Sequence, residues 1–204
     1  MILDKLKYGA INNKKIISFL LGLGILGIIF GSLFIFFVSN TDQNITINYI
    51  SDYISNLTSN NYLECLKSTL TINLSFIVIV WLLGISIIGL PIIIFLYFYK
   101  FFSLGFTLSS FILTYKIKGL FYSIFYVLPV QIFIYVLFVL ITLYGIKMSF
   151  NLIYSIFKKK DVNFKKVINK YLYILTICLI GIVILSLLET FLTPILFNFI
   201  TSFK

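Results

Sequence analysis

Long apolar runs alternate with short polar segments along the whole chain. A membrane-spanning helix needs about 20 consecutive apolar residues. Five runs approach or exceed this length, over residues 16–38, 70–99, 101–115, 119–146 and 171–188. The pattern predicts an all-α fold: a polytopic integral membrane helix bundle of about five transmembrane helices, forming a single domain over residues 1–204.

The boundary between the second and third runs has two solutions. From Leu70 to Tyr115 the only charged residue is Lys100, and one helix over this stretch would be about 69 Å long. A turn at Pro91 would place Lys100 inside the third helix, at a cost of about 2.5–3.5 kcal/mol at mid-membrane. A turn at Lys100 leaves a third helix, Phe101–Tyr115, of only about 22 Å. We expect the second arrangement, with a kink at Pro91 and Lys100 reaching the near surface.

Two further segments depend on prolines. The fourth run is expected to kink at Pro129. Beyond the fifth run, Thr190–Ile200 is too short to cross a bilayer, so residues 189–204 are expected to form a C-terminal cap or interfacial segment containing Glu189, Thr193 and Pro194. Glu189 and Lys100 are then expected near opposite faces, too far apart to pair.

Charge predicts the orientation. All 16 basic residues are lysines, against 6 acidic residues, which gives a net charge of +10. With the N-terminus inside, the inner face holds twelve lysines and two acids, and the outer face holds four of each. Because lysines accumulate on the cytoplasmic side, the chain is expected to be a multi-pass cell-membrane protein with a cytoplasmic N-terminus and an extracytoplasmic C-terminus.

Composition argues against an enzyme. The chain is 61% hydrophobic and only 11% charged, and it has no histidine. It therefore lacks the usual proton shuttle and the commonest metal ligand. Cys65 and Cys178 are far apart, so a zinc site or a redox pair is not expected. No catalytic residue, cofactor or metal site is predicted.

Glycines suggest close helix packing. Residues 22–27 match G-x-G-x-x-G, but inside a transmembrane helix the backbone amides are already bonded, so nucleotide binding is rejected. Gly27 and Gly31 form the G-x-x-x-G spacing that lets helix backbones approach, and a homodimer through them is reasonable. The positions expected to shape helix packing are Gly24, Gly27, Gly31, Gly84, Gly89, Pro91, Gly105 and Pro129.

Two segments outside the runs are candidate interaction sites. The basic inner loop, residues 147–170, is either only the orientation signal or a membrane-surface site for lipid or a partner. Its lysines are Lys158, Lys159, Lys160, Lys165, Lys166 and Lys170. Nucleic acid is not an expected partner, since no aromatic-basic module accompanies them.

The outer loop, residues 39–69, has apolar residues at helical spacing and predicts an amphipathic helix. This helix either lies on the outer leaflet or docks an external protein. The residues of this docking face are Ile47, Ile50, Ile54 and Leu57.

Several local patterns together resemble the stage II sporulation protein M family. They are Trp81 to Pro91, Lys100 with Leu104-Gly105-Phe106-Thr107, Val127-Leu128-Pro129, and Glu189 to Pro194. The resemblance implies a non-enzymatic role in endospore formation, in the septal membrane of the mother cell. It also implies recruitment of two cell-wall hydrolases, stage II sporulation proteins P and D, during engulfment of the forespore.

The chain departs from the wider family at the fourth span. That family often has Pro-His-Gly followed by Glu, whereas Val130 and Gln131 follow Pro129 here, and Ile134 stands at the acidic position. The departure weakens a proton-coupled transport function. The favoured hypothesis is a membrane scaffold for peptidoglycan hydrolases.

The alternative hypothesis is a permease or exporter subunit working with a cytoplasmic ATPase. Helices broken at Pro91 and Pro129 motivate it, because broken helices line transporter sites. It predicts a polar cavity at mid-membrane.

Overall fold

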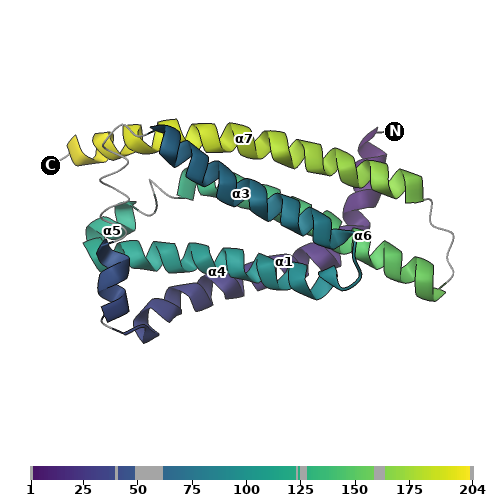
Figure 1. Cartoon of the computed structure of the whole chain (residues 1–204), viewed down its shortest axis with the longest axis horizontal. Coiled ribbons are helices and arrows are strands. Elements are labelled where there is room, and N and C mark those ends of the chain that lie inside the picture. Colours follow the sequence, from purple (N-terminus) through teal and green to yellow (C-terminus); the bar gives the residue numbers. More distant parts are fainter. Residues whose placement is uncertain are drawn as a thin grey trace.

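The computed structural model describes residues 2–39, 41–48, 62–122, 124, 128–158 and 164–202. Within these ranges every regular element is helical (Figure 1). A short helix covers residues 41–48. The other elements are α1 (Ile2–Phe37), α3 (Tyr62–Gly84), α4 (Gly89–Tyr115), α5 (Ile117–Tyr122), α6 (Leu128–Lys158) and α7 (Phe164–Ser202).

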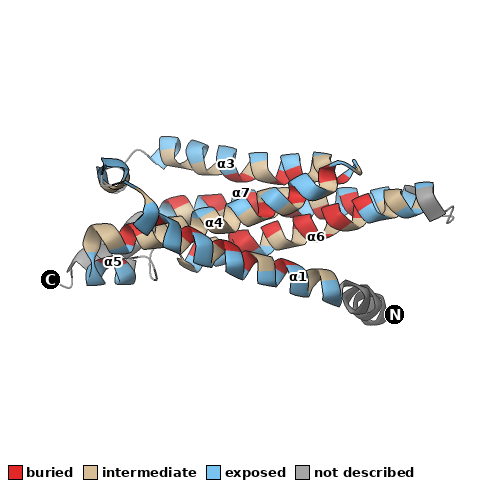
Figure 2. Cartoon of the chain, turned by 90° about the horizontal axis from the view of Figure 1, so that it is seen from below, coloured by how far each residue is buried: buried red, intermediate tan, exposed pale blue. Residues whose placement is uncertain are grey.

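Five helices in the described part of the chain are long and apolar enough to cross a membrane. Their candidate spans are Lys14–Phe37, Tyr62–Gly84, Gly89–Tyr115, Leu128–Ile156 and Lys165–Leu192. Helices suit a bilayer because each satisfies its own backbone hydrogen bonds. Exposed side chains lie on the outward faces of the bundle (Figure 2), and many of them are large and apolar, such as Phe37, Phe95 and Phe133. The predicted all-helical membrane fold is confirmed.

Helix α6 is the centre of the bundle. Half of its span is buried, compared with 17–28% of the other four spans. It contacts α1, α3, α4 and α7, and its side chains Ile134, Phe138 and Ile141 are fully buried. In Figure 1, α3 and α7 lie along one side of the molecule and the α1–α4 pair along the other.

The turn between α3 and α4 corrects the expected boundary. The chain turns at Ile85–Ile88, and α4 then continues through Lys100 to Tyr115. Pro91 is the third residue of α4. In the first turn of a helix the backbone N–H groups have no partner within the helix, so a proline, which lacks this group, is tolerated there. Pro91 therefore belongs to the start of α4 and does not kink the previous helix. At the turn, the Ser149 hydroxyl lies 3.1 Å from the carbonyl oxygen of Gly84 and 3.0 Å from that of Ser86.

Two other proline-based expectations also differ from the structure. Pro129 is the second residue of α6, so it begins a helix and does not kink one. Helix α7 continues through Glu189 to Ser202, so no separate cap begins at residue 189. Thr193 and Pro194 belong to this helix, but their side chains lie outside the described part of the structure.

The two ends of the bundle differ in charge. The lysine-rich end holds the first turns of α1, the Ile85–Ile88 turn, the last turns of α6 and the first turns of α7 (Figure 1). The opposite end holds the last turns of α1 and α4, the beginnings of α3 and α6, and α5.

Candidate functional site

The glycine motif of α1 packs against α4 of the same chain. A side-chain carbon added at Gly27 or Gly31 would meet the backbone of Phe98 or Phe102, and one added at Gly105 would meet the backbone of Ile28. The Ser32 hydroxyl donates to the carbonyl oxygen of Gly105 over 3.3 Å. The face of the motif is therefore covered within the chain, so these glycines no longer argue for a homodimer.

The other predicted packing glycines lie at separate contacts. Gly24 faces the rings of Phe101 and Tyr97 on α4. Gly84 lies against Tyr171 and Gly145, so α3, α6 and α7 meet there, and Gly89 lies against the backbone of Leu83 across the turn. At each position the lack of a side chain lets neighbouring atoms approach closely.

A polar cluster lies inside the bundle, between α3, α4, α6 and α7. The Lys100 ammonium donates to the Asn73 side-chain oxygen over 3.3 Å, and the Gln131 amide donates to a Glu189 oxygen over 2.8 Å. These four side chains line one cavity of about 160 Å³. The charges of Lys100 and Glu189 attract each other across it.

The expectation that Lys100 and Glu189 lie near opposite faces is wrong. Because α4 continues through Lys100, this residue lies near the middle of a 27-residue helix and faces the interior. There its ammonium also lies over the rings of Phe138 and Phe76, 4.9 and 5.7 Å from their centroids. The Tyr135 hydroxyl donates to the Lys100 carbonyl oxygen over 2.9 Å. The neighbouring helices therefore accommodate a lysine in the middle of a candidate span by supplying polar and aromatic partners.

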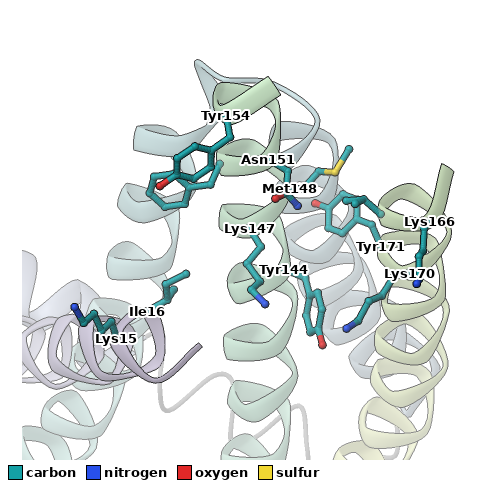
Figure 3. A pocket seen from close by; sticks show the side chains of 12 residues that line it. Lys15, Ile16, Tyr144, Lys147, Met148, Asn151, Tyr154, Lys166, Lys170 and Tyr171 are labelled. Carbon is teal, nitrogen blue, oxygen red and sulfur yellow. The ribbon is translucent and has the colours of Figure 1, made fainter. Parts of the chain in front are cut away.

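A second, larger cavity lies at the lysine-rich end. It has a volume of about 670 Å³ and is bordered by α1, α6 and α7. Four of its lining residues are lysines: Lys15 on α1, Lys147 on α6, and Lys166 and Lys170 on α7. Figure 3 shows Lys147 and Lys170 extending toward Tyr144 from facing helices. Their ammonium nitrogens lie 5.9 and 5.5 Å from the centroid of the Tyr144 ring. We call this space the basic cavity.

The sequence pointed to only part of the basic cavity. Lys166 and Lys170 belong to the predicted membrane-surface site, whereas Lys15 and Lys147 belong to no site that the sequence predicts. The missed signal is a stripe of polar and aromatic residues at helical spacing on α6: Tyr144, Lys147, Asn151 and Tyr154. Lys165 is exposed and does not line the cavity. The side chain of Lys158, and both Lys159 and Lys160, lie outside the described residues.

The predicted docking face of the outer loop is largely outside the described structure. Ile47 lies in the short helix over residues 41–48 and is partly exposed. Ile50, Ile54 and Leu57 lie outside the described residues. Docking at this face therefore stays a prediction.

The described residues contain no group of side chains suited to metal binding. No cluster of three or more His, Cys, Asp or Glu side chains occurs among them. Cys65 and Cys178 are free thiols, the first partly buried and the second buried. The polar cluster and the basic cavity are two chemically distinctive places in the described bundle.

Comparison with protein families connects this architecture to a biological process. Residues 16–194 match the family model described as stage II sporulation protein M. This range includes the five spans except for Lys14 and Lys15, the polar cluster, and all the basic cavity except Lys15. Searches of curated proteins and of solved structures found no match. The chain therefore belongs to the stage II sporulation protein M family, and it is a sporulation-related, multi-pass membrane protein.

Proposed function

We propose that the protein is a non-enzymatic scaffold that anchors or recruits peptidoglycan hydrolases at the septal membrane during forespore engulfment. The family match over residues 16–194 carries this proposal. The packing of the bundle supports it, because α6 is surrounded by four helices and forms a stable base for an external docking segment. The partners of this scaffold are stage II sporulation proteins P and D.

The docking segment of the scaffold is the outer loop between α1 and α3. Its apolar positions Ile47, Ile50, Ile54 and Leu57 recur at helical spacing, and an amphipathic helix can place such a face against a partner. This location requires that the lysine-rich end be cytoplasmic, as the distribution of lysines favours. The mother-cell septal membrane is the location that the family role implies.

Co-purification from sporulating cells tests the scaffold. A tagged chain is expected to recover the two hydrolases, and the pair Ile50→Asp and Ile54→Asp is expected to lose at least about 90% of them, since each carboxylate would have to be desolvated at the interface. The matched control is Ser51→Asp with Ser55→Asp, which adds the same charge at neighbouring positions of the loop. Equal recovery with both pairs would refute docking at this face. Absence of hydrolases from the unaltered chain would refute the scaffold.

The small polar cavity favours a second function, that of a permease or exporter subunit. It is lined by Lys100 and Glu189 within the span region, and ionisable groups at such depth commonly mark transport paths. However, its volume of about 160 Å³ is below the roughly 300–1,000 Å³ of ligand pockets. Recovery of a cytoplasmic ATPase instead of hydrolases in the same purification would favour this function.

A further inference from the structure

We propose that the basic cavity is a binding site for the headgroup of an anionic phospholipid. The site is separate from the outer loop on which the scaffold function depends, and it lies at the lysine-rich end of the bundle (Figure 3). The phosphate of this headgroup would lie between Lys147 and Lys170. Lys15 and Lys166 would lie at the border of the cavity.

The charges of the cavity call for an external anion. Lys147 and Lys170 approach the same tyrosine ring from two helices and repel each other. No acidic side chain of the described residues lines the cavity. Only two acids, Asp4 and Asp161, belong to the polar segments at this end, against eleven lysines. Pairing both acids would still leave most of these positive charges without a counter-charge from the protein.

The size and lining of the cavity suit a headgroup. Its volume of about 670 Å³ lies within the range of ordinary ligand pockets. Beside the lysines, the Asn151 amide offers a further hydrogen-bond donor. Ile16, Phe150 and Val167 add an apolar part to the same wall. Such a mixed lining accommodates a charged headgroup together with the beginning of an acyl chain.

The depth of the lysines favours a lipid over a soluble anion. Lys170 lies five residues inside the span that begins at Lys165, about 8 Å along the helix. Lys147 lies nine residues inside the span that ends at Ile156, about 14 Å along the helix. Lysine stems can extend from such depths toward the headgroup layer. A phospholipid phosphate already lies in this layer, and basic pockets between transmembrane helices are known to bind anionic headgroups.

Lipid titration followed by native mass spectrometry tests the proposal. The full chain in neutral detergent is titrated with phosphatidylglycerol, with phosphatidylcholine, and with inorganic phosphate. The test variant is Lys147→Gln with Lys170→Gln. The matched control is Lys14→Gln with Lys165→Gln, which removes two lysines from the same end that do not line the cavity. Thermal unfolding in the same detergent checks the fold of each variant.

The expected result is preferential binding of phosphatidylglycerol. Each lysine near an anionic headgroup contributes about fivefold in affinity, so the test variant should bind about 25-fold more weakly. The control should change by less than about twofold. If the double variant does not fold, Lys170→Gln alone, at an exposed position, is expected to lose about fivefold. Equal losses in test and control variants, unchanged affinity in the test variant, or equally tight binding of inorganic phosphate would each overturn the proposal.

Discussion

The polar cluster and the basic cavity handle positive charge in opposite ways. In the cluster, Lys100 has a hydrogen-bond acceptor in Asn73 and an opposite charge in Glu189, and the Gln131 amide bonds the same carboxylate. In the basic cavity, the ammonium groups of Lys147 and Lys170 lie near the same aromatic ring, that of Tyr144. None of the described residues that line this cavity is acidic. One lysine is compensated by the chain, while the others are left to an external partner.

Position along the bundle explains the difference. Lys147 lies two residues before Ser149, which contacts the α3–α4 turn, whereas Lys100 lies eleven residues inside α4 from that turn. An ion inside the hydrocarbon core cannot exchange partners with water, so a lysine there is tolerated only when the protein supplies its counter-charge and acceptors. Near the headgroup layer, water and lipid phosphates are available, and an uncompensated lysine costs little. Where the chain supplies a counter-charge, the charge is structural; where it does not, the charge is available for binding.

The largest expected effect comes from removing one charge of the polar cluster. Lys100→Met leaves the Glu189 carboxylate without an opposite charge, and Glu189→Leu leaves the Lys100 ammonium without one. Each substitution should therefore lower the free energy of unfolding by about 3 kcal/mol. The double variant leaves no isolated charge and should recover at least half of that loss. Unfolding of the purified variants in detergent measures all three. Strictly additive losses in the double variant would contradict the compensation described for the cluster.

The next effect concerns α1, which borders the basic cavity but not the polar cluster. Gly31→Leu places a side chain against the backbone of α4 and should cost about 2 kcal/mol of stability, through overpacking. Gly22→Leu is the matched control, because nothing lies within 4 Å of that position. The control should be neutral or slightly stabilising, since leucine favours helix more than glycine does. Equal destabilisation of both variants in thermal unfolding would show that the α1–α4 contact is not the cause.

One tyrosine from each region allows a direct comparison of the polar cluster and the basic cavity. The Tyr135 hydroxyl donates to the Lys100 carbonyl oxygen, and the Tyr171 hydroxyl donates to the Trp81 carbonyl oxygen, both over 2.9 Å. Replacing either tyrosine by phenylalanine should cost about 1 kcal/mol. Of these two tyrosines, Tyr171 lines the basic cavity and Tyr135 does not. Only Tyr171→Phe should therefore also change the affinity for phosphatidylglycerol. A change in lipid affinity with Tyr135→Phe would break the separation of the two regions.

The smallest effect has the opposite sign. Lys147→Gln removes one of two mutually repelling charges and should raise stability in neutral detergent by about 0.5 kcal/mol, in contrast to the loss expected for Lys100→Met. Adding phosphatidylglycerol should stabilise the unaltered protein more than this variant, because a ligand stabilises the state to which it binds. A destabilisation above about 1 kcal/mol in lipid-free detergent would mean that the protein itself compensates Lys147.

The sequence predicts the spans well because span formation depends on local apolar length. Their number follows from the apolar runs, because each run must bury its backbone polar groups. Their ends follow less closely: α3 begins at Tyr62 and not at residue 70, and α6 covers Leu128–Lys158 and not residues 119–146. The turn before α4 lies at Ile85–Ile88 and not at Lys100, because the folded chain supplies partners that lower the cost of a lysine inside the helix. Those partners, Asn73 and Glu189, are 27 and 89 positions away in the chain. Likewise, Lys147 and Lys170 converge only through the packing of α6 on α7. Contacts of this kind depend on helix tilt and rotation, which apolar periodicity does not determine.

The turn at Ile85–Ile88 has a consequence for biosynthesis. It carries no charged residue, and the hydroxyl that reaches its carbonyl oxygens belongs to Ser149, 63 positions after Ser86. Translation therefore delivers α3, the turn and α4 to the membrane well before their hydrogen-bond donor. Until α6 arrives, these two carbonyl oxygens depend on water and lipid headgroups at the lysine-rich end. The turn gains its Ser149 contacts only when α6 packs beside it, so a nascent chain that stalls before α6 has the backbone hydrogen bonds of the turn but not these side-chain contacts.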